Sequence, residues 1–445
     1  MTLLIHGATV VTSLDPPRVG RLDLLVENDR VAAVAPSLAS NGPALDATEC
    51  LIVPGNVNAH MHAYAALARG MPYRLAPPRD FLEILRRVWW RLDRALDPAS
   101  IRASALVAAR EAVLAGTTTL IDHHASPNAI GGSLDIIADA FAEVGIRSVL
   151  AYEVTDRDGP ERSAAGIEEN RRFLRRVVDG GNPLSRAMVG AHASFTLSDE
   201  SLAECAALAE RAQTGLHVHV AEDAVDRGAL RRLNDSGALT PGSLAAHAVH
   251  LDPDEAEIIR ARHITVAHNP RSNMNNGVGR ARLDWLGDDV AVGTDGIGSD
   301  MWEEGRAGYL RRREESLATP LDWALRRLQA SAACAGRVFH EPLLGGIEVG
   351  APADLVMLDY RPPSPLDDAS LGGHWVYGMS AAHVRDVIVA GRLVVRERRL
   401  VGADDGQISA MATEQSSSLW ARMDNIEAHG FEPRPAPAAA LAGRR

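Results

Sequence analysis

Hydrophobic positions change their spacing twice along this chain. Residues 1–53 alternate short apolar runs with turns, which predicts a small unit of β-strands. Beyond residue 54, short apolar runs alternate with helical patterns, and the candidate strands lie near 55–60, 117–122, 146–152, 187–191, 215–220, 244–248, 263–267 and 289–294. Eight strands separated by helices favour a distorted (β/α)8 TIM barrel over an open sheet.

Local signals place two of the helices. One pattern runs from Ser100 to Ala115, preceded by Asp97-Pro98 as a start signal and ended by Gly116. Another runs from Leu202 to Ala212, with Ser198 as its expected N-cap.

The β character returns after Ala333, which predicts a composite fold. We expect residues 1–53 and 340–407 to form one small β-sandwich that flanks a metal-dependent catalytic barrel of residues 54–339. Residues 408–430 are predicted to form a C-terminal helix. The Pro/Ala-rich residues 431–445 are predicted to be a mobile tail.

Composition restricts the partners. The net charge is −12 over 445 residues and no basic cluster is present, which argues against nucleic acid. No apolar run approaches the ~18–20 residues of a membrane helix. Three distant cysteines and an N-terminus without a secretion signal predict a cytoplasmic protein. We expect a small-molecule substrate and a homo-oligomer.

The chain contains no lysine, and all 46 of its basic residues are arginines. A binuclear metal centre bridged by a carbamylated lysine is therefore excluded, and so is a Schiff base on a lysine amine.

Ionisable residues gather where the predicted strands end. Active sites of barrels lie at the carboxyl ends of the strands. His-x-His on a strand places both rings on one face. The residues at these ends are His60, His62, His192, His219, His247, His268 and Asp295. Such a grouping predicts a metal site.

Three imidazoles and one carboxylate, from His60, His62, His219 and Asp295, suit one divalent metal with an open position for water. The set favours Zn²⁺, with Fe²⁺ and Mn²⁺ as alternatives. The metal would lower the pKa of its water toward ~7 and so provide hydroxide. His217 shares a face with His219 but lies one layer deeper, and we interpret it as a barrel-interior residue.

Three residues are predicted to be catalytic. Asp295 would ligate the metal and accept the proton of the water. Glu222, three residues past His219, would carry protons to a ring nitrogen and to the leaving group. His247 would contact the hydroxide or polarise the attacked carbon.

Other polar and aromatic residues are candidates for the substrate pocket. His192 has no place among four ligands, which favours a substrate contact. His123 and His124 end the second strand, and either support the ligands or line the pocket. Trp89 and its neighbour Trp90 follow the first strand, where they either cover the site or pack within a helix.

These motifs together resemble the amidohydrolase superfamily, in its cytosine-deaminase and chlorohydrolase-like branch. The residues that carry the resemblance are Pro54-Gly55-x-x-Asn58-Ala59-His60-x-His62, His219-x-x-Glu222, residues 246–251, His268-Asn269-Pro270-x-Ser272-Asn273, Gly293-Thr294-Asp295 and residues 346–356. Within that branch, residues 65–71, 122–127, 152–159, 192–200 and 272–274 resemble SsnA-type aminohydrolases.

The resemblance implies the same ligands, His60, His62, His219 and Asp295, and the same catalytic pair, Glu222 and His247. Its His-x-x-Glu spacing selects His219 over His217. Arg69, inside one of the matching segments, becomes a further candidate for substrate contact.

The predicted function is metal-dependent deamination of an amino-substituted nitrogen heterocycle, with attack by a metal-bound hydroxide and release of ammonia. Hydrolysis of a cyclic amide such as a hydantoin or imidazolone is an alternative, as is displacement of chloride at the same site. A non-catalytic metal-binding scaffold is a remote third hypothesis, which Glu222 and His247 argue against because a purely structural metal needs neither.

Overall fold

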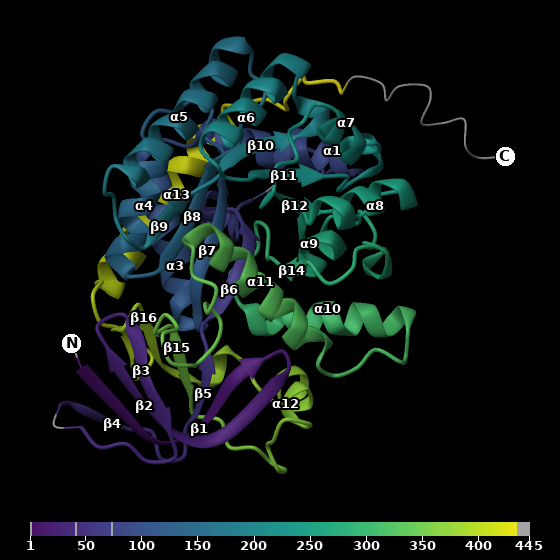
Figure 1. Ribbon diagram of the computed structural model, residues 1–445. Coiled ribbons are helices and arrows are strands. Elements are labelled where there is room, and N and C mark those ends of the chain that lie inside the picture. Colours follow the sequence, from purple (N-terminus) through teal and green to yellow (C-terminus); the bar gives the residue numbers. More distant parts are fainter. Residues whose placement is uncertain (1, 41, 73, 434–445) are drawn as a thin grey trace.

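The computed structural model describes residues 2–40, 42–72 and 74–433, and it confirms the predicted fold class: a distorted (β/α)8 barrel beside a small β domain (Figure 1). The barrel consists of two parallel arcs, one ordered β6-β7-β8-β9 and the other β10-β11-β12-β13-β14. Single bridges join the arcs, from Met61 to Asp295 and from Val154 to Ala191. The barrel strands are β6 (Asn56–Met61), β7 (Thr117–His124), β8 (Arg147–Tyr152), β9 (Ser185–Ala187), β10 (Val189–Ala193), β11 (Leu216–Val220), β12 (Leu244–His247), β13 (Thr265–His268) and β14 (Val290–Val292). Only Met188 separates β9 from β10, so these two segments together form the fourth of the eight barrel strands.

Every residue of these strands except Arg186 in β9 is buried. Helices cover the outer face of the barrel and side chains fill its interior, so strands here carry apolar residues on both faces. This burial explains the short continuous apolar runs of the sequence. It also means that polar side chains within the strands must find partners inside the protein.

Helices alternate with the strands around the barrel. The principal ones are α3 (Pro98–Leu114), α4 (Ser133–Val144), α5 (Pro160–Val178), α6 (Asp199–Arg211), α7 (Ala229–Asp235), α8 (Pro253–Arg262), α10 (Met301–Glu315) and α11 (Trp323–Phe339). Helix α3 starts two residues before the predicted Ser100, because Asp97 caps it and Pro98 occupies its first position.

Shorter helical segments line the strand ends and loops. They are η1 (Ala63–Ala68), α1 (Phe81–Ile84), the π-helical turn η2 (Leu85–Trp89), α2 (Trp90–Ala95), η3 (Ser194–Thr196), η4 (Ala224–Asp226), α9 (Pro270–Asn275), η5 (Leu283–Trp285), α12 (Leu371–Tyr377) and η6 (Ala381–His383). The π-turn η2 leads directly into α2, at Trp89 and Trp90.

The small β domain combines both ends of the chain in one sheet, ordered β18-β17-β16-β15-β5-β1-β2-β3, with β4 paired to β1. The antiparallel pairing of β5 with β15, for example Val53 with Val356, joins the two halves. Its strands are β1 (Thr2–Leu14), β2 (Pro17–Glu27), β3 (Arg30–Ala35), β4 (Ala44–Asp46), β5 (Leu51–Pro54), β15 (Leu355–Leu358), β16 (Val384–Val389), β17 (Arg392–Arg396) and β18 (Arg399–Leu400).

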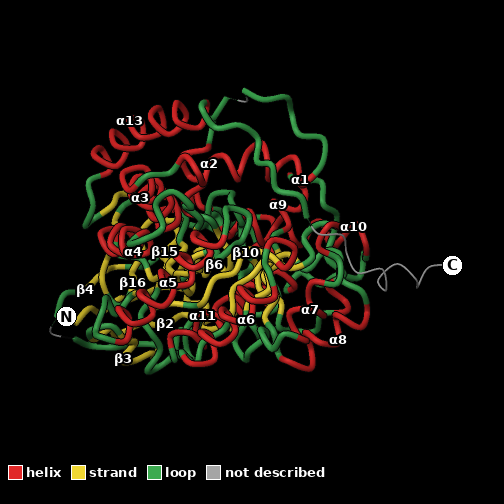
Figure 2. The backbone as a smooth tube through the Cα atoms, turned by 90° about the horizontal axis from the view of Figure 1, so that it is seen from above, coloured by secondary structure: helices red, strands yellow, loops and turns green. Residues whose placement is uncertain are grey.

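The C-terminal part of the chain crosses back over the barrel. Helix α13 (Asp405–Asp424) packs against α2 and α3 (Figure 2), and it ends six residues before the predicted limit at 430. The following segment is held by Arg86, whose Nε donates to the carbonyl of Phe431 at 2.9 Å. The predicted mobile tail therefore begins too early, because residue 431 is anchored; residues 434–445 lie outside the described residues.

Over the described residues, no helix combines the length and the apolar character needed to cross a membrane.

Candidate metal centre

Two chain segments more than 230 residues apart form the floor of the site. The carbonyl of His60 accepts hydrogen bonds from the amides of Thr294 at 2.9 Å and Asp295 at 3.0 Å. Below them, the side chain of Asn58 donates to the Thr294 hydroxyl at 2.7 Å and accepts from the Thr294 amide at 3.1 Å. These bonds fix His60, His62 and Asp295 on one rim, as the Gly-Thr-Asp motif predicts.

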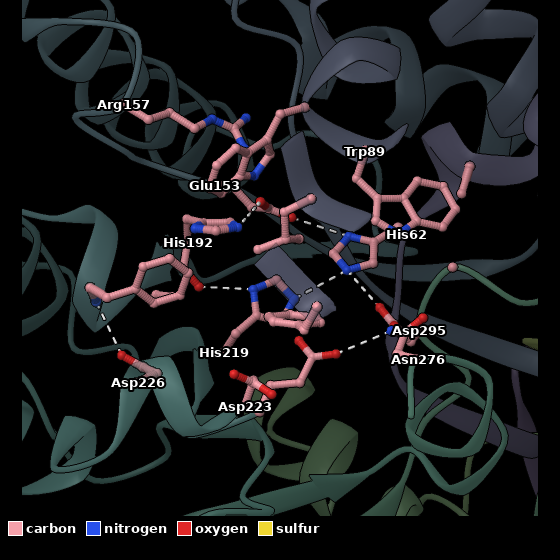
Figure 3. A pocket seen from close by; sticks show the side chains of 18 of the residues that line it. His62, Trp89, Glu153, Arg157, His192, His219, Asp223, Asp226, Asn276 and Asp295 are labelled. Atoms are coloured by element: carbon pink, nitrogen blue, oxygen red, sulfur yellow. Dashed lines mark hydrogen bonds and ion pairs between the residues drawn. The ribbon is translucent and has the colours of Figure 1, made fainter. Parts of the chain in front are cut away.

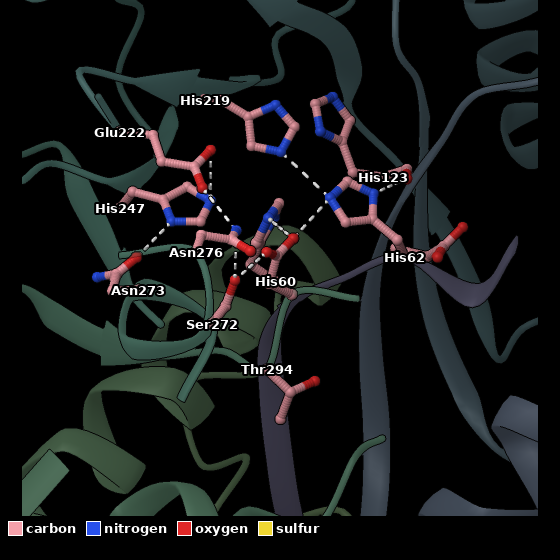
Figure 4. Close-up of polar contacts among 12 residues, drawn as sticks. His60, His62, His123, His219, Glu222, His247, Ser272, Asn273, Asn276 and Thr294 are labelled. Atoms are coloured by element: carbon pink, nitrogen blue, oxygen red, sulfur yellow. Dashed lines mark hydrogen bonds and ion pairs between the residues drawn. The ribbon is translucent and has the colours of Figure 1, made fainter. Parts of the chain in front are cut away.

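Two imidazoles point their Nε2 atoms at each other. His62 donates from Nδ1 to the carbonyl of His123 at 2.6 Å, and His219 donates from Nδ1 to the carbonyl of His192 at 2.8 Å. Each neutral ring therefore carries a lone pair on Nε2, yet these two atoms lie only 3.2 Å apart (Figure 4). Such a pair needs a cation between or beside its members, which is the arrangement of a metal site.

The metal-free protein relieves this opposition with a proton. Burial lowers the pKa of His62, but the carboxylates of Asp295 and Glu153 outweigh burial and raise it well above the ordinary value. Burial holds the pKa of His219 well below the ordinary value. A divalent cation can replace the proton of His62 and satisfy both rings.

Further donor atoms face the same point. Ligand atoms of His60, His219, His247 and Asp295 all lie within 4.8 Å of one another. Nε2 of His60 is buried and has no hydrogen-bond partner, while its Nδ1 lies 2.8 Å from Nε2 of His217. The orphaned nitrogen fits a metal ligand, and His217 supports the His60 ring from behind, as the sequence predicts for an interior residue.

The two carboxylate oxygens of Asp295 have different partners. Oδ1 lies 2.9 Å from Nε2 of His62 and 3.5 Å from Nε2 of His60, whereas Oδ2 accepts a hydrogen bond from the Ser272 hydroxyl. Burial raises the pKa of Asp295, but its contacts with His60 and His62 outweigh burial and hold the pKa well below the usual range. The side chain is thus a carboxylate, and its backbone is left-handed, at φ 55°. Such rare conformations gather at functional sites.

Glu222 and His247 lie beside this cluster (Figure 4). Oε2 of Glu222 is 3.5 Å from Nε2 of His247, and Oε1 accepts from the Asn276 amide at 3.2 Å. Burial raises the pKa of Glu222 to about 7, so both of its protonation states are populated at neutral pH. Glu222 can therefore give and take a proton where the metal ligands converge.

A pocket of about 660 Å³ opens onto the cluster. Trp89, Trp90, Phe81 and Phe195 form its apolar wall, and His192 lies on its polar side (Figure 3). The π-turn before Trp90 lets two adjacent tryptophans line one cavity. The predicted candidates Trp89 and His192 therefore both reach the pocket.

Four other candidates lie elsewhere. Arg69 forms a two-point ion pair with Glu111 and its side chain is 62% exposed, so the predicted substrate contact has no support from its position. His123 is fully buried behind His62, stacked on His217. His124 donates to or accepts from Ser126 at 2.9 Å. His268 lines a separate cavity with Arg311.

Sequence reasoning missed Glu153, which directly follows β8. Its side chain is 2% exposed and faces the pocket. Burial raises the pKa of Glu153, but contacts with His62 outweigh burial and lower it below the usual value. The strand-end rule that selected the histidines also marks this position, since Glu153 ends a strand on the same rim.

Known proteins resemble this chain over most of its length. Residues 51–394 match the amidohydrolase family. A 5'-deoxyadenosine deaminase of Methanopyrus kandleri is 33% identical over 385 residues, covering 83% of this chain and 86% of that protein. A 5-methylthioadenosine/S-adenosylhomocysteine deaminase of Pelotomaculum thermopropionicum is 31% identical over 442 residues, covering 94% and 98%.

Solved structures share the fold. An adenosine deaminase from Xanthomonas campestris with bound zinc superposes with a TM-score of 0.81 at 23% identity, covering 95% of this chain and 99% of that one. Atrazine chlorohydrolase from Arthrobacter aurescens with zinc reaches 0.79 at 23% identity, covering 93% and 100%.

Proposed function

Because this chain belongs to the amidohydrolase family, we propose that its physiological reaction is the hydrolytic deamination of a 6-aminopurine compound or a close ring analogue. The predicted superfamily is confirmed, as is the predicted enzyme class, a hydrolase of carbon–nitrogen bonds other than peptide bonds. The purine ring is suggested by relatives named as deaminases of adenosine-type nucleosides.

His60, His62, His219 and Asp295 are the residues that would hold the metal. The donor set of three imidazoles and one carboxylate favours Zn²⁺. A divalent cation bound there would supply an acidified water as the nucleophile.

The residues of this chain account for the proton transfers. Asp295 directs Oδ1 toward the cluster and can accept the first proton of the attacking water. Glu222 in its protonated form gives a proton to the ring nitrogen beside the attacked carbon, takes up the proton of the newly added hydroxyl group, and gives that proton to the departing amine. The proton held by Asp295 then restores the acid form of Glu222. The oxygen of water becomes the ring carbonyl, and its two protons end on the ring nitrogen and on ammonia.

The position of Glu222 beside the cluster is the observation that carries the deaminase reaction: its Oε2 lies 3.5 Å from Nε2 of His247, whose ring faces His60, His219 and Asp295. A carboxyl group with a pKa of about 7 is matched to both steps, because it can donate to a weakly basic ring nitrogen and then be reprotonated. Its neighbour His247 supplies a second proton-transfer group within 3.5 Å.

The test is ammonia release by metal-analysed protein from adenosine, 5'-deoxyadenosine, 5'-methylthioadenosine, pterins, aminopyrimidines and aminotriazines. We expect activity with at least one purine. Glu222→Gln should lower kcat by about 10² to 10⁴ with unchanged metal content. Glu210→Gln, on the exposed face of α6, is the matched control and should behave as the wild type.

Other products would indicate a different reaction at the same site. Ring opening without ammonia would indicate cyclic-amide hydrolysis, and chloride release from chlorotriazines would indicate dehalogenation. Either result, with no ammonia from any substrate, would contradict deamination.

A further inference from the structure

One carboxylate in the pocket has no role in the deamination proposed above. Oε1 of Glu153 lies 3.1 Å from Nδ1 of His62 and 3.5 Å from Nδ1 of His123. The single proton on Nδ1 of His62 is already donated to the His123 carbonyl at 2.6 Å. Among the described residues, Oε1 is therefore left without a hydrogen-bond partner in a side chain that is almost fully buried. An unsatisfied carboxylate in such a place costs free energy unless something else binds it.

The other oxygen of Glu153 faces a second acceptor. Oε2 lies 3.9 Å from Nε2 of His192. The Thr196 hydroxyl donates to the Ala193 carbonyl at 3.1 Å, and so it accepts the proton on Nδ1 of His192, at 2.8 Å. This leaves Nε2 of His192 as an acceptor. Two acceptors thus lie side by side on the pocket wall, and the dashed line between them in Figure 3 marks their 3.9 Å contact. With no proton between these two atoms, they do not form a hydrogen bond with each other.

The charged residues around these acceptors are mostly acidic, which also favours hydrogen-bond donors on the substrate. Among the described residues that line the pocket, the carboxylic acids are Glu153, Glu222, Asp223, Asp226 and Asp295, and the permanent cation is Arg157. The guanidinium of Arg157 is already engaged by Asp93 and Asp158 and covers the ring of Trp90. No uncommitted cation of this lining is available to a phosphate or carboxylate on the substrate.

We propose that Glu153, together with His192, determines specificity by receiving hydrogen-bond donors of the substrate other than the amine that leaves. The enzyme then takes uncharged or cationic ring compounds rich in N–H or O–H groups and rejects those that carry phosphate or carboxylate. This inference rests on the proposed deaminase function for the identity of the ring, but the binding of donors by Glu153 can be measured without turnover.

The test compares ligands that differ in donors, against wild type, Glu153→Gln and Glu153→Ala. Adenosine and 2',3'-dideoxyadenosine differ in sugar hydroxyls, while 2,6-diaminopurine and adenine differ in one ring amino group. Dissociation constants are measured by calorimetry on zinc-loaded protein that also carries Glu222→Gln, so that the ligands bind without being turned over. Values of kcat/KM are measured from ammonia release without that substitution. Elemental analysis reports the metal content of each variant.

In at least one pair, wild type should prefer the ligand with the extra donor by about tenfold or more, and both Glu153 variants should abolish that preference. The pair that responds identifies the source of the donor, sugar or ring. Adenosine monophosphate should bind wild type at least about tenfold more weakly than adenosine, and Glu153→Gln should narrow this gap. Asp223→Asn, which removes a charge from the same pocket, should affect both members of each pair equally.

The inference would be overturned if the Glu153 variants weakened the binding of both members of every pair equally, or if their main effect were loss of the metal. Tight binding of adenosine monophosphate to wild type would overturn it as well. Loss of the metal would assign Glu153 to the support of His62 alone. Failure of the deaminase proposal can be distinguished from failure of this inference. In that case wild type would release no ammonia, while calorimetry would still show a preference for ligands with the extra donor. Absence of donor preference in the wild type by calorimetry would also refute the role of Glu153.

Discussion

Asn273 accepts a hydrogen bond from Nδ1 of His247 through its side-chain oxygen, at 2.8 Å. Because the proton of the neutral ring is placed on Nδ1, Nε2 is an acceptor. This nitrogen has no hydrogen-bond partner within residues 2–40, 42–72 and 74–433, and it lies 3.5 Å from Oε2 of Glu222. The amide of Asn273 therefore selects the tautomer of the histidine.

Replacing Asn273 with alanine should lower kcat by about 10- to 100-fold, the usual cost of removing a partner that orients a functional histidine. The metal content should stay unchanged. Asn275→Ala, exposed on the same short helix α9, serves as the control. If the effects of Asn273→Ala and His247→Ala simply added in the double variant, Asn273 would not act through His247.

Activity should decline on the alkaline side of neutrality. Burial raises the pKa of Glu222 to about 7, and the acid form is the one that can protonate the ring. As pH rises through this value the proton is lost, so kcat/KM should fall about tenfold for each further pH unit. Measurement of kcat/KM from pH 5.5 to 9.5 tests this decline. A rate that kept rising through pH 9 would contradict the role of Glu222 as the acid.

Removal of the metal should reduce both activity and stability. Without a metal, the Nε2 atoms of His62 and His219, 3.2 Å apart, depend on a proton on His62. A divalent cation replaces that proton and binds both rings. Dialysis against a chelator should abolish ammonia release and lower the Tm, and Zn²⁺ should restore both. His219→Ala should reproduce the chelated state and fail to respond to added Zn²⁺. Full activity after chelation would refute the metal centre.

Gly293 occupies a position where no side chain fits. A Cβ atom there would lie 2.6 Å from Oδ1 of Asn269 and 2.7 Å from both the amide nitrogen and the carbonyl oxygen of His60. Gly293→Ala should therefore destabilise the protein by about 1 to 3 kcal/mol or more, as overpacking does, and weaken metal binding by displacing His60. Gly373→Ala is the control, because its Cβ would meet only the Leu321 side chain at 3.6 Å. Equal denaturation midpoints for the two variants would contradict this reading.

The barrel and its rim could be predicted because both depend on local signals. Alternating strands and helices appear in the apolar pattern, and a His-x-His on a strand fixes His60 and His62 on one face. The strand-end rule marks Glu153 as a rim residue, but its contact with His62, ninety-one residues earlier, depends on how the strands lie in space and appears only in the structure. The position of Phe431 could not be predicted for the same reason, because its contacts Trp90 and Phe195 lie in other parts of the chain.

The seam between β6 and β14 has a consequence for how the protein is made. His60 lies in the first barrel strand, His62 directly follows that strand, and Asp295 follows the last strand, so the proposed ligand set is complete only after the ring of strands has closed. Contacts this distant in sequence form late in folding. A newly synthesised chain that has not yet closed its barrel would hold zinc weakly, so tight zinc uptake during refolding reports the final docking step.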